Sequence, residues 1–415
     1  MEVYKFGGAS VKDADGIRNL GSIVKEYKGE LLVVVSALGK TTNALENVVA
    51  EYLEKGSAPE SKIEYLESYH KNIIEELGLQ GGVFEKVGKE FSDLGAFFLE
   101  TDSGDYDFIY DQVVSRGEIW STIIVDAWLR ECEIDTEWWD IRKLLITDSR
   151  FRDANINWEE SRARIKQMYL GRKSGVVVTQ GFIGGAEGVY ATTLGREGSD
   201  FTAGIIANIL DAERVTVWKD VPGVMNADPE WLSGTQKLSV ISYKEAVEMS
   251  FSGAKVIHPK TIKPLHNKGI PLIVRSFLNP SDPGTMISVD ESIAQDVPLF
   301  IKKEKQVLVS LVPKDFSFVI GDNLAILFHR FYEKGIKINL VQTSAVSIAV
   351  SVDEDIMKLN GLIAVLSEEY KVLVNRDVEL ITLRYYSDEA IKRVTSGREV
   401  LLEQRTRRSI RYVLG

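Results

Sequence analysis

The chain has 415 residues, of which 44% are hydrophobic and 27% charged, an ordinary balance for a folded globular protein of roughly two or three domains. Its formal net charge of -11 disfavours a nucleic-acid partner, which would require a basic surface. No apolar run approaches the ~18 residues that a membrane span needs, no secretory leader is recognisable, and the sequence has one cysteine. We therefore expect a cytoplasmic protein without a membrane span, a disulfide framework or a multi-cysteine metal site.

Short apolar runs alternate with longer amphipathic stretches over the first 290 residues. Residues 31–35 (LLVVV) are all apolar and mostly β-branched, which is typical of a strand buried on both faces. The alternation predicts an α/β fold with a mostly parallel sheet and with ligands beyond the carboxyl ends of its strands. The expected elements are a strand at 3–6, a helix at 14–27, a strand at 31–35, a mostly helical tract at 43–130, and strands at 175–179, 214–218 and 271–274.

The character of the sequence changes at a cluster of helix and strand breakers, residues 279–284 (NPSDPG). Shorter elements in the order βαββαβ follow over about residues 307–374, which predicts a compact α+β unit. Residues 378–415 begin a second, shorter unit. We therefore expect one large α/β domain followed by a pair of small α+β domains.

Several familiar motifs are absent from the sequence. Gly39-Lys40-Thr41 looks like the end of a P-loop, but Val34 stands where that motif needs a glycine. The dinucleotide fingerprint GxGxxG, the kinase HRD loop and the GxSxG elbow are also missing. The sequence therefore argues against a Rossmann dehydrogenase, a protein kinase and an esterase.

Two loops that follow the first two predicted strands are candidate binding elements. Lys5 precedes Gly7 and Gly8, whose amides can approach a phosphate that the lysine also reaches, although a turn with a surface lysine explains the pattern equally well. Ser36 and Thr42 follow the second strand, where they either contact a ligand or cap a helix.

The loop 194–203 (LGREGSDFTA) combines complementary chemistries at the start of a predicted helix. Arg196 can clamp a carboxylate in a two-point contact, and Asp200, next to Ser199, can bind an amine or orient a lysine. A purely structural loop seldom needs this combination, so we expect a binding site here.

A lysine and an aspartate, Lys219 and Asp220, directly follow the predicted strand 214–218. Turn chemistry accounts for the proline and glycine that follow Lys219 and Asp220, but it does not account for the charges. Downstream, Lys255 lies close to another glycine. His258 directly precedes Pro259 and is expected to pack or to cap a helix rather than to catalyse.

Taken together, these phrases resemble the aspartate kinase (aspartokinase) family, within the amino-acid kinase fold. They occur in the order of that family and cover nearly all of the first 290 residues, and the C-terminal part resembles the tandem ACT regulatory domains of the same enzymes. The matching phrases are KFGGAS at 5–10, VVVSALGKTTN at 33–43, SRGE at 115–118, LGREGSDFTA at 194–203, KDVPGV at 219–224 and GAKVIHPK at 253–260.

The resemblance implies a three-layer α/β/α, carbamate-kinase-like catalytic domain over residues 1–290. It also implies that ATP and Mg²⁺ convert L-aspartate to 4-phospho-L-aspartate, the first step of lysine, threonine and methionine biosynthesis. The nucleophile would be the side-chain carboxylate of the substrate, so positioning and electrostatics would carry the catalysis.

Roles for individual residues follow from the same resemblance. Lys5 would contact the transferring phosphoryl group, and Asp200 would orient the substrate or the lysine; these two are the expected catalytic residues. The expected substrate-binding residues are Thr42, Glu118, Arg196 and Ser199. The expected ATP-binding residues are Lys5, Gly7, Gly8, Ser36, Lys219, Asp220, Lys255 and Val256, and no residue is expected to form a protein metal site.

Some positions depart from the pattern of the family. Ala9 replaces the usual threonine of KFGGTS, Lys219 replaces a common threonine, and Met225 and Glu230 stand where many members carry a tyrosine and an arginine at the nucleotide. Those nucleotide roles are not carried over. The main catalytic positions are retained, so we expect activity.

In the C-terminal region, residues 337–344 (KINLVQTS) resemble the ACT effector segment, where family members bind lysine or threonine at a dimer interface. Asn339, Thr343 and Ser344 would then contact the effector, although Ala345 replaces a frequent glutamate and the segment is equally explained as a strand of the sheet. We expect a first ACT-like domain at 305–375, a second at 291–304 and 376–415, and a homodimer or higher homo-oligomer.

Two other functions stay open. Another amino-acid kinase, acting on a different carboxylate, carbamate or phosphate, would share the phosphate-binding loops, but the SRGE phrase and the ACT-like tail argue against it. A non-catalytic amino-acid sensor that kept the fold is favoured by Ala9 and Glu230. Such a sensor would bind lysine or threonine but not ATP with Mg²⁺.

Overall fold

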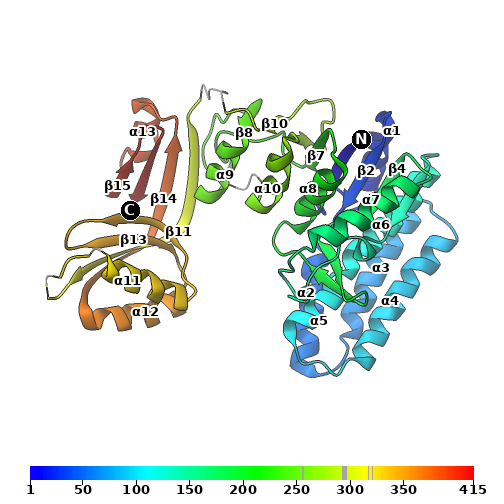
Figure 1. Cartoon of the computed structure of the whole chain (residues 1–415), viewed down its shortest axis with the longest axis horizontal. Coiled ribbons are helices and arrows are strands. Elements are labelled where there is room, and N and C mark those ends of the chain that lie inside the picture. The colour runs from blue at the N-terminus through cyan, green and yellow to red at the C-terminus, as the bar shows by residue number, and fades with distance from the viewer. Residues whose placement is uncertain (255–256, 292–296, 316, 320) are drawn as a thin grey trace. The chain divides into compact units, whose positions relative to one another are not determined.

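The computed structural model describes residues 1–415 except 255–256, 292–296, 316 and 320, and it forms two compact units (Figure 1). The N-terminal unit comprises Met1–Val224, Lys237–Val247 and Val256–Ile293. The C-terminal unit comprises Met225–Gln236, Glu248–Lys255 and Ala294–Gly415, so it takes two short segments from within the first 290 residues. Among the described helices, none has both the length and the apolar character that a membrane span requires.

An eight-stranded sheet with the order β3-β4-β2-β1-β7-β9-β10-β8 forms the centre of the N-terminal unit. The strands from β3 to β9 run parallel, β10 is antiparallel to β9, and β8 is parallel to β10. The prediction of a mostly parallel α/β sheet is confirmed, and the five predicted strands are neighbours at its centre. The strands are β1 (Glu2–Phe6), β2 (Leu31–Val35), β3 (Thr136–Trp139), β4 (Val176–Gln180), β7 (Arg214–Lys219), β8 (Val240–Ser242), β9 (Leu272–Ser276) and β10 (Thr285–Ser288).

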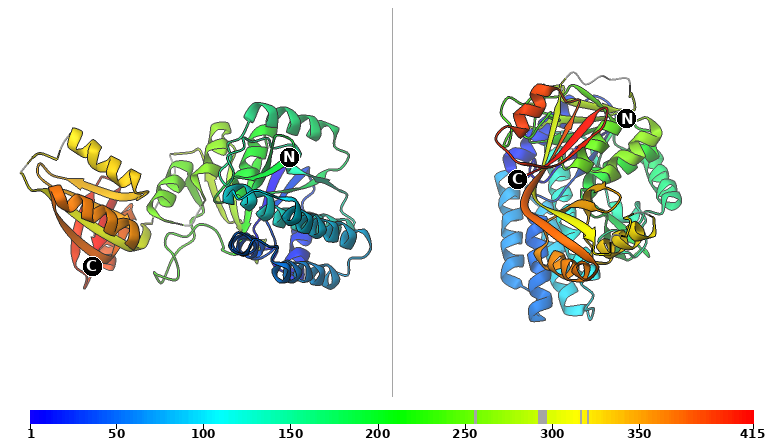
Figure 2. Two further views of the ribbon diagram at one scale, coloured as in Figure 1. Left: turned by 90° about the horizontal axis from the view of Figure 1, so that it is seen from below. Right: turned by 90° about the vertical axis from the view of Figure 1, so that its left-hand side faces the viewer.

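Helices cover both faces of this sheet (Figures 1 and 2). Helices α1 and α6 pack on one face and α8 on the other, with α7 and α10 against α8, and every residue of β1 and β2 is buried. The helices are α1 (Ala14–Glu26), α2 (Thr41–Lys55), α3 (Glu60–Glu76), α4 (Gly82–Glu100), α5 (Tyr106–Val114), α6 (Arg116–Glu131), the 3₁₀ turn η1 (Ile141–Lys143), α7 (Trp158–Gly171), α8 (Gly198–Leu210), α9 (Tyr243–Ser252) and α10 (Pro259–Lys268).

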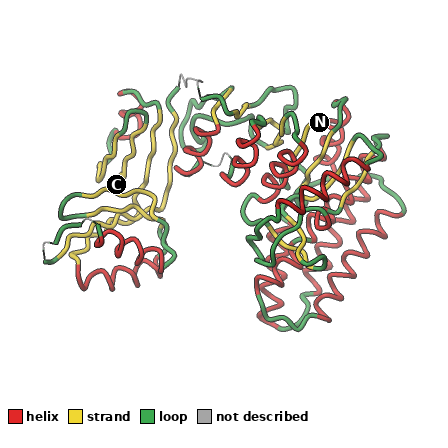
Figure 3. Tube along the Cα trace, viewed as in Figure 1, coloured by secondary structure: helices red, strands yellow, loops and turns green. Residues whose placement is uncertain are grey.

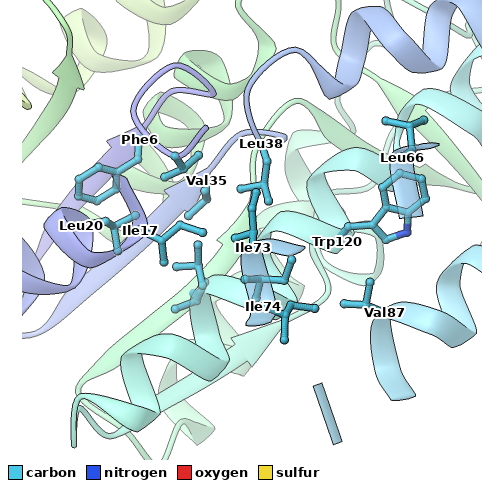
Figure 4. Close-up of a cluster of buried hydrophobic side chains, with 14 of the residues drawn as sticks. Phe6, Ile17, Leu20, Val35, Leu38, Leu66, Ile73, Ile74, Val87 and Trp120 are labelled. Carbon is cyan, nitrogen blue, oxygen red and sulfur yellow. The ribbon is translucent and has the colours of Figure 1, made fainter. Parts of the chain in front are cut away.

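A continuous apolar core joins the first face of the sheet to the helices that follow β2 (Figure 4). Phe6 from β1, Leu20 from α1 and Ile73 from α3 are almost fully buried in it, and Trp120 from α6 stacks on Phe91 with ring centroids 3.9 Å apart. Each such side chain contributes about 1.5–3 kcal/mol when buried. This core fixes the end of β1 and the start of α6, from which site residues project.

The strands that sequence analysis missed are short or lie at sheet edges. They are β3, β8, β10 and the two-stranded hairpin β5 (Ile183–Ala186) and β6 (Tyr190–Thr193). The hairpin contains Gly184 and Gly185, which usually indicate a turn. Here a Cβ atom at Gly185 would lie 2.1 Å from the carbonyl oxygen of Arg142, so close backbone packing requires glycine inside the strand.

The C-terminal unit is built on a six-stranded antiparallel sheet with the order β12-β13-β11-β14-β16-β15 (Figure 3). Apolar residues of this sheet pack against α11 and α12 in one cluster and against α13 in another. Its elements are β11 (Leu299–Pro313), α11 (Asp322–Glu333), β12 (Ile338–Thr343), β13 (Ile348–Asp353), α12 (Ile356–Glu369), β14 (Tyr370–Arg384), α13 (Asp388–Thr395), β15 (Val400–Arg405) and β16 (Ser409–Leu414).

Two strands of 15 residues, β11 and β14, pair along the length of this sheet, where sequence analysis expected separate shorter strands. Their register shifts around Gln306, and Lys305 and Asp377 adopt positive φ angles of 51° and 54°. These irregularities are bulges, which interrupt the apolar alternation and bend the strands. The division of this unit into two ACT-like domains stays a prediction.

Helix α9 belongs to both units, with Tyr243–Val247 in the first and the remainder in the second. Basic side chains hold its second half on the C-terminal sheet. Arg384 Nη1 donates to Glu248 Oε2 at 3.1 Å, and the cationic groups of Lys337 and Arg411 lie 5.8 and 5.9 Å from the ring centroid of Phe251. The second half of α9 is therefore anchored to the C-terminal sheet.

Candidate active site

Four parallel strands, β4, β2, β1 and β7, have their carboxyl ends at the same edge of the N-terminal sheet. Phe6 pairs with both Val35 and Trp218, and Val35 pairs with Gln180. A cavity of about 750 Å³ opens at this edge, within the size range of sites for small molecules and cofactors. All the predicted substrate and nucleotide residues that the structure describes line it: Lys5, Gly7, Gly8, Ser36, Thr42, Glu118, Arg196, Ser199, Asp200, Lys219 and Asp220. Lys255 and Val256 lie outside the described residues.

Two lysines flank one buried carboxylate in this cavity. Lys5 Nζ lies 2.6 Å from Asp200 Oδ1, and Lys219 Nζ lies 3.9 Å from Asp200 Oδ2. Burial alone would raise the pKa of Asp200, but the neighbouring ammonium groups of Lys5 and Lys219 outweigh it and hold the pKa below its usual value. The carboxylate stays ionised and fixes two positive charges beside the open volume.

The glycine loop after β1 passes very close to the loop after β2. A Cβ atom at Gly8 would lie 2.6 Å from the carbonyl oxygen of Ala37 and 2.8 Å from that of Gly39, so only glycine fits. The Gly39 amide donates to the Gly8 carbonyl at 3.0 Å. The amides of Gly7 and Gly8 donate to no other described residue, which leaves them available to an anion.

Glu118 projects from the first turn of α6 and is fully buried. Its Oε1 accepts a hydrogen bond from the Ala37 amide at 3.3 Å, whereas its Oε2 has no partner among the described residues. Burial raises the pKa of Glu118 to about 8. A buried oxygen without a partner is unusual, and beside a cavity it suits the ammonium group of a ligand.

Arg196 stands exposed in the loop between β6 and α8, and none of the described residues forms an ion pair with it. Ser199 follows in the first turn of α8, where a Cβ atom at Gly181 would lie 2.5 Å from the Ser199 Cβ. Neither Ser36 nor Thr42 caps α2, because Lys40 holds the N-cap position. The hydroxyl groups of Ser36 and Thr42 therefore do not cap α2.

The cavity is also lined by residues that sequence analysis missed, among them Tyr110, Arg152, Phe182, Thr193 and Glu197. Arg152, Phe182 and Glu197 adopt positive φ angles of 68°, 69° and 54°. Such conformations cost about 1–3 kcal/mol each and gather at functional sites. Phe182 follows a predicted strand, so the rule that ligands lie beyond strand ends could have found it, and Glu197 lies inside the loop 194–203 that the sequence already indicated. The segments that carry Tyr110, Arg152 and Thr193 show no local pattern.

A buried aspartate fixes one wall of the cavity from behind. Asp111 Oδ2 accepts hydrogen bonds from the amides of Arg152 and Thr193 at 3.0 and 2.8 Å, and Oδ1 accepts one from the Thr193 hydroxyl at 2.7 Å. Burial raises the pKa of Asp111 to about 6. This carboxyl group holds together two segments that are distant in sequence.

The carboxylates of the cavity fit a loosely held Mg²⁺ ion rather than a protein cage. Among the described residues, no group of three or more His, Cys, Asp or Glu side chains could hold a metal ion. Asp220 and Asp200 both line the cavity, but Asp200 is paired with Lys5 and Lys219, so Asp220 is the carboxylate left to a cation. Mg²⁺ in nucleotide sites is usually bound by one or two carboxylates together with phosphate oxygens and water, so this donor set is sufficient.

The predicted effector residue Asn339 is engaged in a polar network inside the C-terminal unit. Its Nδ2 donates to Gln306 Oε1 at 2.9 Å and to Asp353 Oδ1 at 2.8 Å. Its Oδ1 accepts from Lys303 Nζ at 2.8 Å. Asn339 therefore links the edge strand β12 to the long strand β11.

The other two predicted effector residues lie at the far end of β12. Thr343 and Ser344 are exposed, and Ser344 is bonded to Ser347 through both backbone and hydroxyl. Four residues along a strand span roughly 13 Å. The structure does not bring these two hydroxyl groups together with the amide of Asn339.

Comparisons with known proteins agree with this geometry. The model described as the amino acid kinase family matches residues 1–276. The lysine-sensitive aspartokinase 3 of Escherichia coli (strain K12) is 32% identical over 409 residues, covering 96% of this chain and 89% of the relative. The crystal structure of E. coli aspartokinase III with aspartate and ADP (R-state) has a TM-score of 0.82 at 28% identity, covering 100% of this chain and 96% of that one.

A second structure of the same bacterial enzyme, with lysine and aspartate (T-state), has a TM-score of 0.80 at 29% identity and covers 100% of this chain and 95% of that one. The similarity thus extends through both units rather than over the N-terminal sheet alone. The chain belongs to the amino acid kinase family and, within it, to the aspartokinases.

Proposed function

We propose that this chain transfers the γ-phosphoryl group of ATP to the side-chain carboxylate of L-aspartate, giving ADP and 4-phospho-L-aspartate. One observation carries the proposal: the pair Lys5 and Asp200 lines the same cavity as Arg196 and Glu118, whose Oε2 has no partner among the described residues. The first pair provides an end for phosphate, and the second pair provides an end for an amino acid.

At the phosphate end, the main task is to bring two anions together and to stabilise the phosphoryl group in transfer. Lys5 and the amides of Gly7 and Gly8 would contact its oxygens, and Asp200 would hold Lys5 in place without abstracting a proton. Ser36 would face the path of the phosphate. These groups are fixed before the substrates bind, which is the requirement for electrostatic catalysis.

At the amino-acid end, Arg196 would bind the α-carboxylate in a two-point contact, and Glu118 would bind the ammonium group through Oε2. Thr42 and Ser199 would complete the contacts to aspartate. This arrangement leaves the side-chain carboxylate of the substrate directed toward Lys5. The substrate itself supplies the nucleophile.

The nucleotide would lie along the carboxyl end of β7. Lys219 and Asp220 would contact its phosphates, and Lys255 and Val256 would complete the nucleotide site. A bound Mg²⁺ ion would neutralise phosphate charge, with Asp220 as the cavity carboxylate that would hold it.

Regulation by lysine is proposed for the C-terminal unit, with threonine as the alternative effector. Lys303 bonds to Asn339 at one end, and its side-chain stem packs on Gly253, where a Cβ atom would lie 2.7 Å from Lys303 Cγ. Gly253 is two residues before the proposed nucleotide residue Lys255. Lys303 would therefore relay a change at β12 to the segment around Gly253.

Assembly of the enzyme is proposed to occur through the C-terminal sheet. β12 is an edge strand, and unpaired backbone groups at an edge favour pairing with a second copy. Size-exclusion chromatography with light scattering tests this, and a purely monomeric protein at micromolar concentration would contradict it.

The test of the activity is a coupled assay of ADP release with L-aspartate and, separately, with L-glutamate. We expect turnover with aspartate that clearly exceeds turnover with glutamate. Equal rates would favour another amino-acid kinase. A non-catalytic sensor would release no ADP and would bind lysine but not ATP with Mg²⁺ in calorimetry.

A further inference from the structure

A second cavity, of about 600 Å³, is lined by helices α7, α8 and α10 and by the loop before α7. Helices α7 and α10 both pack against α8, and all of these segments belong to the N-terminal unit (Figure 1). The volume is within the size range of sites for small molecules and cofactors. Because this cavity shares no lining residue with the candidate active site, no role described above uses it.

One face of α10 borders this second cavity and is basic. The residues of α10 that line the cavity are Lys260, Lys263, Pro264, Asn267 and Lys268. They follow one another at the spacing i, i+3, i+4, i+7 and i+8, which places side chains on one side of a helix. Since α10 contains no acidic residue, this face presents lysines without an intervening carboxylate.

The start of α10 is fixed beside the cavity. His258 caps the helix by accepting a hydrogen bond from the Lys260 amide at 3.2 Å, which confirms the expected capping role. Lys260 Nζ lies 3.4 Å from the carbonyl oxygen of Leu194 and pairs with Asp153. The first of the three lysines is therefore held in place by contacts outside the cavity lining.

The charge of the cavity lining is entirely positive. Arg162 from α7 joins the three lysines of α10, and no acidic side chain of the described residues lines the cavity. Lys268 pairs with Asp211, but Lys263 forms no ion pair with any residue in the described part of the chain. In a chain with 61 acidic and 50 basic residues, a cavity lined in this way favours an anion.

A buried amide fixes the position of Arg162. Asn208, on α8, is only 7% exposed, and its Nδ2 donates to the Pro264 carbonyl of α10 at 2.8 Å. Its Oδ1 accepts a hydrogen bond from Arg162 Nη2 at 3.4 Å. These two bonds join the three helices around the cavity. The guanidinium group forms no salt bridge with a described carboxylate, so its charge is available to a ligand.

Aromatic side chains complete the lining. Trp158 begins α7 and Phe201 lies in the first turn of α8, and both line the cavity. Neither ring is in contact with another aromatic ring of the described residues. Trp158 is 38% exposed. An exposed indole beside cationic groups suits a planar ring that carries negative charge, because the ring can stack while the charge is neutralised.

We propose that this cavity is a second binding site, for an organic phosphate that carries a planar ring, as a nucleotide does. Lys263 and Arg162 would contact the phosphate, since lysine and arginine both bind phosphate groups strongly. Trp158 would stack on the ring. The site goes beyond the proposed function, because it uses none of the candidate active-site residues and does not require that the chain phosphorylate aspartate.

Calorimetric titration of the full chain with GMP, UMP and FMN tests the site, with excess ADP and Mg²⁺ present to occupy the candidate active site. We expect at least one of the three to bind once per chain with a Kd below about 1 mM. The matching nucleoside or riboflavin, and inorganic phosphate alone, should bind at least about tenfold more weakly. Absence of binding by all three nucleotides would overturn the proposal, and so would phosphate that binds as tightly as the best of them.

Two substitutions assign the binding to this cavity. Lys263→Glu and Trp158→Ala should each raise the Kd about tenfold or more, because one repels the phosphate and the other removes the stacking surface. Both side chains are exposed, so thermal unfolding should be unchanged. Lys166→Glu is the matched control, since Lys166 is exposed on α7 but does not line the cavity.

The control variant should bind the nucleotide within about twofold of wild type. An equal loss in Lys166→Glu and Lys263→Glu would show a general attraction between charges and would overturn the site. Unchanged affinity in both Lys263→Glu and Trp158→Ala would place the nucleotide elsewhere, with the same consequence. A chain that shows the expected pattern of binding but phosphorylates no aspartate would contradict the proposed function alone.

Discussion

The ammonium group of Lys5 lies 2.6 Å from Asp200 Oδ1, and the two side chains are only 11% and 4% exposed. Each charge is therefore stabilised chiefly by the other, with Lys219 as a more distant partner. Removing one member of a buried pair leaves an uncompensated charge, whereas removing both does not. The pair thus links stability to the proposed catalytic role of Lys5 at one point of the cavity.

We expect Lys5→Met and Asp200→Asn each to lower the free energy of unfolding by about 3–5 kcal/mol. The double variant should be more stable than Lys5→Met, because no unpaired charge remains. Turnover should fall at least about 100-fold in every variant that lacks Lys5. Urea denaturation and the ADP assay measure the two effects, and a double variant with near-normal turnover would disprove the catalytic role.

Aspartate binding should release a proton through Glu118. With a pKa of about 8, about nine-tenths of this carboxyl is protonated at pH 7, and an arriving ammonium group favours its ionised form. Calorimetry in two buffers of different ionisation enthalpy should show close to one proton released per site at pH 7. Glu118→Gln should show no such dependence on the buffer.

The same group makes stability depend on pH with a definite sign. The pKa of Glu118 in the folded chain lies above its ordinary value of 4.5, so the folded state holds the proton more tightly than the unfolded state. Its contribution to stability is therefore present at low pH and is lost as pH rises from about 4.5 to about 8. The stability difference between wild type and Glu118→Gln, measured by urea denaturation across this range, should decline accordingly; a difference that grew would contradict the assignment.

Arg196 should affect binding of aspartate without affecting folding. Loss of a two-point contact to a carboxylate in Arg196→Ala is expected to raise the KM for aspartate about 100-fold, whereas the free energy of unfolding should change by less than about 0.5 kcal/mol, since the side chain is exposed. Arg196→Lys should recover little, because an ammonium group cannot make the planar contact. An unchanged KM in Arg196→Ala would remove the carboxylate clamp from the proposal.

Lys303→Met should weaken inhibition while leaving basal turnover intact. A screen with lysine, threonine and methionine first identifies the effector. The concentration for half-inhibition should then rise about tenfold, because the link between Asn339 and Gly253 is lost. Lys302→Met is the matched control: Lys302 lies 3.5 Å from Glu379 and 5.2 Å from the Trp231 ring centroid. Equal effects of the two substitutions would rule out a specific relay.

The sequence predicted the cavity well where the site residues follow buried strands directly. Lys5 and Gly8 lie on or just after an unbroken apolar strand, and the parallel register brings them beside Asp220. Tyr110 and Arg152 could not be predicted in the same way. They reach the cavity only because Asp111 joins their region to Thr193, a tertiary contact without a local pattern.

The C-terminal sheet shows a different limit of sequence reasoning. The polar bulges around Lys305 and Asp377 interrupt the apolar alternation, so each long strand is read as two. Similarly, the match of Asn339 to an effector segment does not indicate that its amide is already bonded to Gln306 and Asp353. Periodicity reports exposure along one strand but not the partners across it.

The exchange of segments between the two units has a consequence for how this protein can change during evolution. Trp231 and Leu232, encoded upstream of β8, pack with Phe300 and Tyr412 of the C-terminal sheet. A gene shortened after residue 290 would lose those partners and expose an aromatic surface, so we expect such a product to aggregate. Loss of the proposed inhibition is therefore expected to arise through point substitutions within the interleaved segments, and not through deletion of the tail.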